Sequence, residues 1–388
     1  MPPKNRFAEL LPEITAWRQD FHEHPELLFD VHRTAARVAE LCRDFGCDEV
    51  TEGIGQTGVV AVINGRTNSK GRVIGLRADM DALPIREQTG VPYASKTPGK
   101  MHACGHDGHT AMLLGAAKYL AETRNFDGKV VCIFQPAEEG GGGGREMVQD
   151  GLISHWNIDE VYGMHNMPGI PVGQFAIRPG AMMAASDVFE IVVTGKGGHA
   201  AKPHDCIDTT LVAAHIIVAI QTIVSRNTDP MKQLVISVCT VETDSPASNV
   251  IPQVVKMEGT VRTLDASVQD FVETRLVQLV EGTALALGAK AEVKYQRRYP
   301  VTVNATENTH FAAEVARSIS PEVNTDTPAL MGAEDFSFML NECPGAYIFV
   351  GNGDTAMVHH PAYNFDDNVI PFGSSWYAGM AEARMPVA

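Results

Sequence analysis

The feature that most constrains the fold is an alternation of strand-like and helix-like segments that is interrupted once. Runs rich in β-branched residues at 59–63, 73–76, 130–134 and 161–164 surround a helix-like stretch at 108–123. Such alternation is typical of a largely parallel sheet flanked by helices. We therefore predict an α/β domain in the first part of the chain.

The pattern changes near Met183 and returns near Tyr299. Between them the segments read strand, helix, strand, strand, helix, strand, which is the order of a ferredoxin-like α+β sandwich. These segments are 188–194, 208–224, 234–241, 254–262, 267–287 and 291–295. We predict that residues 1–183 and 299–388 form one domain and that 184–298 form a domain inserted into it.

Composition excludes several classes of function. There are 31 Lys and Arg residues against 47 Asp and Glu, a net charge of −16, which is the wrong sign for general binding to nucleic acid or to an anionic membrane.

The longest apolar stretch, 211–224, is shorter than the roughly 20 residues that span a bilayer, and we predict a buried helix there. The seven cysteines form no CxxC pair and no secretory signal is recognisable, so we expect reduced thiols in the cytoplasm.

The densest polar cluster is the stretch Met101-His-Ala-Cys-Gly-His-Asp-Gly-His109. In extended backbone Cys104 and His106, two residues apart, project to the same side. A thiolate beside an imidazole suits zinc, or manganese and nickel by substitution. The sequence therefore predicts a metal site just before the helix-like stretch.

Further candidate ligands follow other predicted strands. Glu138 and Glu139 come after the strand at 130–134, and His165 follows the next one. Ligands collect beyond the carboxyl ends of strands in α/β sheets. One of the two acids can bind metal while the other accepts a proton from water. With a histidine from the pair His359 and His360, these segments supply enough ligands for two metal ions.

Asp79 and Asp81 end another strand and share a face. They either orient ligand imidazoles or cap a turn, and we count Asp81 among the catalytic residues. The stretch His22-Glu-His-Pro25 does not have the zinc-binding HExxH spacing, so we predict a structural role for it.

At these residues the chain resembles the N-acyl-amino-acid amidohydrolase family, which includes hippurate hydrolases and auxin-conjugate hydrolases and is related to dinuclear aminoacylases and glutamate carboxypeptidases. The matching stretches run in order along nearly the whole chain. They are 77–84, 101–109, 134–140, 163–166, 195–204, 249–252, 259–262 and 332–337.

The resemblance implies an enzyme that hydrolyses the amide bond of N-acyl-amino acids at a dinuclear site. It implies Glu138 as the general base and two divalent ions, Mn²⁺ or Zn²⁺, with Ni²⁺ or Co²⁺ as alternatives. The family pattern of His, a variable residue and Pro selects His359 over His360. The implied metal ligands are Cys104, His106, Glu139, His165 and His359.

The resemblance also assigns roles in the inserted domain. In related enzymes the residue matching His199 reaches the partner subunit's site and helps to hold the scissile carbonyl oxygen. Asn249 and Arg262 are expected to contact the substrate, although a tight loop and a surface salt bridge are their structural alternatives. The resemblance thus implies a homodimer formed through an inserted lid and dimerisation domain.

Three alternatives remain at this stage. The same metal pair serves a dipeptidase or carboxypeptidase. Cys104 with His106 as its base would make a cysteine hydrolase, which survives chelation. A non-catalytic metal-binding protein needs four closed ligands and no spare acid, whereas Glu138 lies beyond the ligand set.

Overall fold

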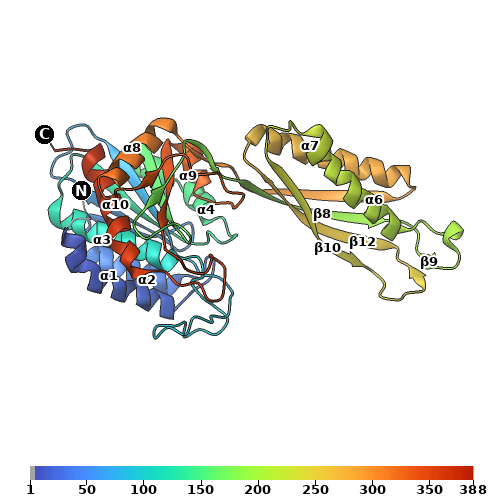
Figure 1. Cartoon of the computed structure of the whole chain (residues 1–388), viewed down its shortest axis with the longest axis horizontal. Helices are drawn as coiled ribbons and strands as arrows, with labels where there is room; N and C mark the ends of the chain where they lie inside the picture. The colour runs from blue at the N-terminus through green and yellow to red at the C-terminus, as the bar shows by residue number, and fades with distance from the viewer. Residues whose placement is uncertain (1–4, 388) are drawn as a thin grey trace. The chain divides into compact units, whose positions relative to one another are not determined.

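The computed structural model describes residues 5–387, which fall into two compact units (Figure 1). The first unit contains the chain up to Met182, Val303–Pro328 and the chain from Asp335 onward. The second contains Met183–Thr302 and Ala329–Glu334. The second unit thus interrupts the first, and its segment Ala329–Glu334 lies outside the range 184–298 expected from the sequence pattern.

The first unit is built on an eight-stranded sheet with the order β1-β2-β4-β3-β5-β16-β6-β15. The central strands β4, β3, β5 and β16 are parallel, whereas β1 and β2 form an antiparallel edge. The prediction of a largely parallel sheet is confirmed. The strands are β1 (Glu49–Ile54), β2 (Gly58–Asn64), β3 (Val73–Asp79), β4 (Lys129–Gln135), β5 (Glu160–Met167), β6 (Phe175–Ala176), β15 (Val323–Asn324) and β16 (Gly345–Gly351).

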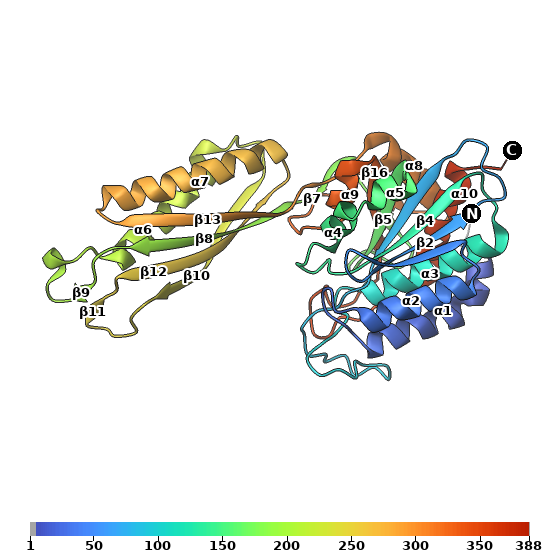
Figure 2. The same cartoon turned by 180° about the vertical axis from the view of Figure 1, so that it is seen from behind.

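Helices cover both faces of this sheet (Figure 2). α3 is buried on nearly all sides between the sheet, α1 and α10, which explains why its sequence is apolar all round. On that face lie α1 (Asn5–Glu23), α2 (His32–Asp44), α3 (His106–Thr123), α8 (Thr306–Arg317) and α10 (Ile370–Arg384), and on the other α4 (Gly143–Gln149), α5 (Leu152–Trp156) and α9 (Ser337–Glu342).

The second unit is a four-stranded antiparallel sheet with the order β10-β12-β8-β13. Its helices start at aspartates, Asp208 and Asp265, whose side chains accept hydrogen bonds from backbone N–H groups of the first turn. The predicted ferredoxin-like order is confirmed. The elements are β8 (Ala185–Thr194), α6 (Thr209–Thr222), β10 (Leu234–Thr243), β12 (Val254–Thr263), α7 (Ala266–Ala286) and β13 (Lys290–Tyr299).

The prediction that the apolar stretch 211–224 is a buried helix is wrong in part. The helical segment Thr209–Asn227 is long and apolar enough to cross a membrane by length and composition, and a third of its apolar window, 33%, is buried. One face of α6 packs on the sheet and on α7, whereas Leu211 and Val218 on the other face are 54% and 71% exposed. Because a helix on a two-layer sandwich buries only one stripe, an apolar sequence leaves apolar residues exposed.

Candidate metal centre and active site

The predicted site residues of the first unit meet at one edge of its sheet. β3, β4, β5 and β16 are parallel neighbours, so their carboxyl ends lie at the same edge. The residues that follow or end these strands are Asp79 and Asp81, Glu138 and Glu139, His165, and His359. The topology thus brings together side chains that are up to 280 positions apart, since 359 − 79 = 280.

Cys104 and His106 lie side by side, but not for the reason predicted. The intervening Gly105 has φ 94°, in the left-handed region, and His106 begins α3. The expectation of extended backbone is therefore wrong. A Cβ on Gly105 would lie 2.2 Å from Nδ2 of Asn166, so only glycine fits this turn. The turn places the thiol and the imidazole where α3 meets the sheet.

Two overlapping groups of ligand atoms lie in this region. Possible ligand atoms of Cys104, His106 and His165 are within 4.8 Å of one another, as are those of Cys104, Glu139 and His359. Sγ of Cys104 is 3.3 Å from Nε2 of His165, and Nε2 of His359 is 3.2 Å from a carboxylate oxygen of Glu139. Sulfur, imidazole and carboxylate ligands suit Zn²⁺, and imidazole and carboxylate suit Mn²⁺. The five predicted ligands thus form one cluster.

An unsatisfied nitrogen atom supports the fit of a metal ion. Nε2 of His106 is buried and has no hydrogen-bond partner within residues 5–387. Its other ring nitrogen, Nδ1, donates to the carbonyl oxygen of Asp81 at 2.8 Å. A metal-binding histidine usually has one ring N–H held by a protein oxygen and the other nitrogen directed at the ion. The buried nitrogen would otherwise be destabilising.

The doubled histidine near the C-terminus divides into two environments. His359, which has φ 67°, faces Glu139. Nδ1 of the exposed His360 instead accepts a hydrogen bond from the backbone N–H of Ala362 at 3.0 Å. The backbone turn at His359 directs the two rings to different places, which favours His359 as the candidate ligand.

Asp81 connects the ligand loops to each other. Its carboxylate accepts the backbone N–H groups of Glu138 at 2.9 Å and Glu139 at 3.1 Å. Its carbonyl oxygen holds His106. Asp81 is almost fully buried, and burial raises the pKa of its carboxyl. Its position indicates that it orients the two glutamates as well as the imidazole.

The two glutamates diverge after a strained turn. Ala137 has φ 53°, which is uncommon for a residue other than glycine. Glu139 joins Cys104 and His359, whereas Glu138 also lies within 4.8 Å of the carboxylate of Asp335. Since both glutamates also lie near His106, one acid can bind a metal ion while the other faces the same centre.

Several supporting residues carry no predicted role. Nδ1 of His109 is 2.6 Å from a carboxylate oxygen of Asp79, and its Nε2 accepts the backbone N–H of Asn166 at 2.9 Å. Both ring nitrogens are engaged, so His109 holds the strand end of His165 in place. The spacing of three between His106 and His109 on one helix puts them on one face, a signal that the sequence does contain.

A second missed group surrounds a buried arginine. Arg77 binds Asp79 at 2.7 Å and Asp335 at 3.0 Å, and Gln135 also binds Asp335, at 2.7 Å. The stretch 332–337 matches the family pattern without indicating this role. The network connects the ends of β3 and β4 to Asp335, where the chain re-enters the first unit.

Without a bound cation, the charges of the cluster favour the protonated forms of His106 and Cys104. Burial lowers the pKa of His106, but Asp79, Asp81 and Glu139 outweigh it and raise the pKa to about 10. Burial, with Glu139 and Glu138 nearby, raises the pKa of the Cys104 thiol well above its usual range. An excess of carboxylates thus surrounds two groups that must lose protons to bind a metal ion.

The predicted residues of the second unit lie in two places. His199 is on the short strand β9 (Gly198–His199), which pairs with β11 (Val250–Ile251), and the backbone N–H of Ala200 donates to the carbonyl of Asn249 at 3.0 Å. His199 and Asn249 are therefore exposed neighbours. Arg262 is half-buried on β12, and it contacts Thr260 and the carbonyl oxygen of Val261.

The stretch around His22 has a structural environment. His22 is buried, and its Nδ1 is 2.8 Å from a carboxylate oxygen of Asp107. Arg18 is also buried and lies 3.6 Å from Asp107. Asp107 adjoins His106 at the start of α3, so this buried ion pair fixes the helix end that carries the candidate ligand.

An α/β unit with a cysteine, histidine and carboxylate cluster at its strand ends, interrupted by a ferredoxin-like unit, defines a class of two-unit metallohydrolases. The model of the peptidase family M20/M25/M40 matches residues 75–383. The chain belongs to this family and is an amidohydrolase.

Individual relatives match along almost the whole chain. The chain is 42% identical to the hippurate hydrolase of Campylobacter jejuni over 375 residues, which cover 96% of this chain and 97% of that protein. It is 41% identical to an N-acetyl-L-cysteine deacetylase of Bacillus subtilis, with 94% and 86% covered. A crystal structure of a dinuclear metal binding peptidase of the M20 family from B. subtilis matches with a TM-score of 0.83 and 34% identity, with 97% and 99% covered.

Proposed function

We propose that the protein hydrolyses the amide bond of N-acyl-amino acids, such as hippurate-like or N-acetyl compounds, to a carboxylic acid and a free amino acid. The observation that carries this proposal is the pair of ligand groups that share Cys104, with Glu138 next to them. The names of the hippurate hydrolase and the N-acetyl-L-cysteine deacetylase to which the chain is similar support the substrate class.

We assign two divalent ions, Mn²⁺ or Zn²⁺, to the five clustered side chains, with Ni²⁺ or Co²⁺ as alternatives. Bound there, such ions lower the pKa of water to about 7 and polarise a carbonyl group. The ligands are Cys104, His106, Glu139, His165 and His359. Nε2 of His106, which has no hydrogen-bond partner among residues 5–387 and lies 3.7 Å from a carboxylate oxygen of Asp79, supports this assignment.

Glu138 acts as the general base in this proposal. Its carboxylate accepts a proton from the attacking water and returns it to the leaving amine. Asp81 holds the backbone of Glu138 and Glu139 and so keeps the two acids in different roles. Hydrogen-bonding or positive groups stabilise the oxyanion, and His199 has this role.

The second unit supplies the remaining contacts and the subunit interface. Asn249 and Arg262 bind the acyl-amino-acid substrate, and the unit acts as a lid and as the contact surface of a homodimer. The exposed Leu211 and Val218, seven residues apart and so on one face of α6, favour such an interface. The seven free cysteines favour a cytoplasmic location.

A cysteine-hydrolase mechanism fits the geometry less well. The imidazole at hydrogen-bonding distance from the thiol of Cys104, 3.3 Å, is that of His165, and not that of the predicted base His106. The thiol is buried and its pKa is raised, whereas a cysteine nucleophile needs a lowered pKa. A dipeptidase or carboxypeptidase would use the same metal pair, so only the preferred substrate distinguishes this alternative from the proposed function.

Two measurements test the proposal together. Elemental analysis should find about two divalent ions per chain, and chelation should abolish activity. N-acetyl- and N-benzoyl-amino acids should be hydrolysed faster than dipeptides of the same amino acids. Activity that survives removal of all metal would refute the metal mechanism, and faster dipeptide hydrolysis would identify a peptidase instead.

A further inference from the structure

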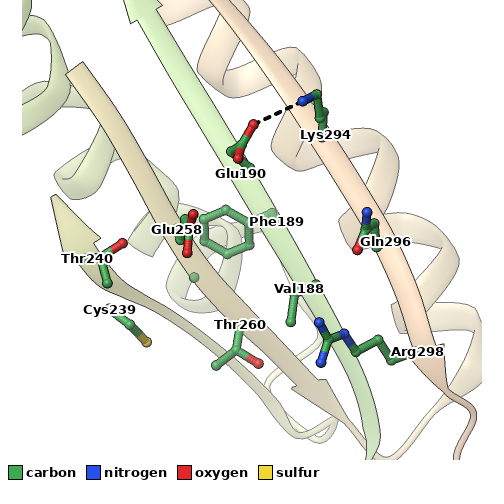
Figure 3. Close-up of a pocket in the computed structure, with 11 residues that line it drawn as sticks. Val188, Phe189, Glu190, Cys239, Thr240, Glu258, Thr260, Lys294, Gln296 and Arg298 are labelled. Carbon is green, nitrogen blue, oxygen red and sulfur yellow. Dashed lines mark hydrogen bonds and ion pairs between the residues drawn. The ribbon is translucent and has the colours of Figure 1, made fainter. Parts of the chain in front are cut away.

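The face of the second unit's sheet that its helices leave open carries a groove of about 430 Å³. Val188, Thr260 and Arg298 lie on neighbouring strands at one end of it (Figure 3). Glu190 and Lys294 lie at the other end. The volume is within the range of small-molecule sites, and the groove lies wholly within the second unit.

Arg298 lies on the groove face of β13 together with Lys294 and Gln296, from which it is four and two residues away. On β13 Arg297 pairs with Asp187 and Tyr299 with Ser186, so Arg298 is the extra residue. Arg297 points to the helix side, where it binds Asp270 and Glu273 of α7. The guanidinium of Arg298 extends instead over Val188 (Figure 3). Arg297 and Arg298 therefore lie on opposite faces of the sheet, as alternation along a strand requires.

Arg262 approaches the same end of the groove from the other side. It pairs with Ser186 on β8, and it follows Thr260, which lines the groove, on the same face of β12. Since neighbouring strands are about 4.8 Å apart, the backbones of Arg262 and Arg298 are about 10 Å apart across β8. The two arginines thus lie on the strands on either side of Ser186.

The acids of this face are already neutralised by lysines. Lys256 binds Glu190 at 2.8 Å and Glu258 at 3.0 Å, and Lys294 binds Glu190 at 3.2 Å. The guanidinium of Arg298 has no ion pair within the described residues 5–387. The arginine end of the groove is therefore positive in a chain whose net charge is −16.

The acid whose charge acts on Arg262, Asp187, has its carboxylate bound on the other face of the sheet. Asp187 accepts hydrogen bonds from the hydroxyl of Tyr295 at 2.7 Å and from Gln269 at 2.8 Å, on the helix side of the sheet. Burial lowers the pKa of Arg262, an effect that Asp187 opposes and Arg298 reinforces. Two forked cations in mutual repulsion, on an otherwise neutralised surface, indicate an anionic ligand.

We propose that Arg298 and Arg262 form a binding site for a small organic molecule with two carboxylates. Each guanidinium takes one carboxylate, and Val188 contacts the carbon chain between them. Because Lys256 and Lys294 are already paired with Glu190 and Glu258, the ligand binds at the arginine end of the groove. The two carboxylates belong either to a free dicarboxylate or to an N-acyl derivative of an acidic amino acid, and the second source rests on the proposed function.

The first experiment measures binding of glutarate to the metal-loaded full-length protein by calorimetry. Arg298→Ala should weaken binding at least about tenfold, the effect of losing one charged bidentate contact. Arg297→Ala is the matched control, because it removes the same charge one residue away on the opposite face. Butyrate and inorganic phosphate should bind at least about tenfold more weakly than glutarate.

Three results would overturn the proposal. They are an absence of glutarate binding, equal weakening in Arg297→Ala and Arg298→Ala, and phosphate binding as strong as glutarate binding. Thermal unfolding of both variants verifies that they fold, and Arg298→Lys, which keeps the charge, should restore part of the affinity if Arg298→Ala is unstable.

The second experiment separates the two sources of the dicarboxylate. If the ligand is the substrate, the ratio of kcat/KM for N-acetylglutamate to that for N-acetylglutamine should fall at least about tenfold in Arg298→Ala and not in Arg297→Ala. An unchanged ratio with lost glutarate binding identifies a free dicarboxylate. If none of the N-acetyl- and N-benzoyl-amino acids is hydrolysed but glutarate still binds through Arg298, the proposed function fails and the site stands.

Discussion

The division of labour between Glu138 and Glu139 gives the sharpest prediction. Glu138→Gln keeps the shape of the side chain and removes only its ability to accept a proton. The loop should not move, because Asp81 holds the backbone N–H groups of both glutamates and not their side chains. General-base catalysis contributes about 10²–10⁴-fold, so the barrier should rise by about 3–5 kcal/mol.

The assay compares Glu138→Gln with Glu139→Gln, the same chemical change one residue away. Glu138→Gln should retain two ions per chain in elemental analysis while kcat falls and KM changes little. Glu139→Gln removes a carboxylate from the group formed with Cys104 and His359, so it should lose about one ion per chain. A Glu138→Gln variant that loses metal, or a Glu139→Gln variant that keeps both ions, would refute the assignment.

Three further predictions concern the surrounding groups. Asp81→Asn can accept only one of the two backbone N–H groups, so unfolding should become easier by about 1–3 kcal/mol in denaturant titration; unchanged stability would contradict the role. Asp107 raises the pKa of His22, against burial, to about 9. The protonated His22 stabilises the fold fully below pH 6.5, and this stabilisation is lost as the pH rises through 9. His22→Gln should therefore lower the free energy of unfolding most near pH 6 and less at pH 9.5. Equal destabilisation at the two pH values would argue against a raised pKa of His22. Metal binding to the ion-free protein at pH 7 should release protons from His106 and Cys104, and calorimetry in buffers of different ionisation enthalpy counts them; no proton release would exclude these ligands.

The periodicity of apolar residues predicts the layers of this fold correctly, because the burial of one or both faces of a strand sets the apolar pattern along that strand. The strands of the first unit read as continuous apolar runs, since helices cover both faces of the sheet. The second unit shows alternation, since its sheet has one open face: along β12 the buried residues Met257 and Val261 alternate with the more exposed Glu258 and Arg262. The same logic fails for α6, because apolar composition does not reveal how many faces a helix buries.

The candidate site is only partly readable in this way. The sequence shows two pairs of residues that bind metal or transfer protons, Cys104 with His106 and Glu138 with Glu139. The members of each pair are close in sequence, so a local pattern is enough to find them. The sequence predicts that Asp81 orients an imidazole, but not that its carboxylate accepts backbone N–H groups, because these belong to the loop after another strand. Alternation along β13 puts Arg298 on the same face as Lys294 and Gln296, but no local pattern shows that Arg262 lies two strands away from it across β8.

By itself, the sequence determined which residue types are available for chemistry and which segments become strands and helices, because side-chain type and periodicity are local properties. Only the tertiary structure decided which of them meet. His359 rather than His360 faces Glu139 because the backbone at His359 is left-handed. Ligands from four strand ends converge because parallel pairing places those ends at one edge of the sheet. That convergence depends on hydrogen bonds between segments far apart in the chain, which no local pattern records.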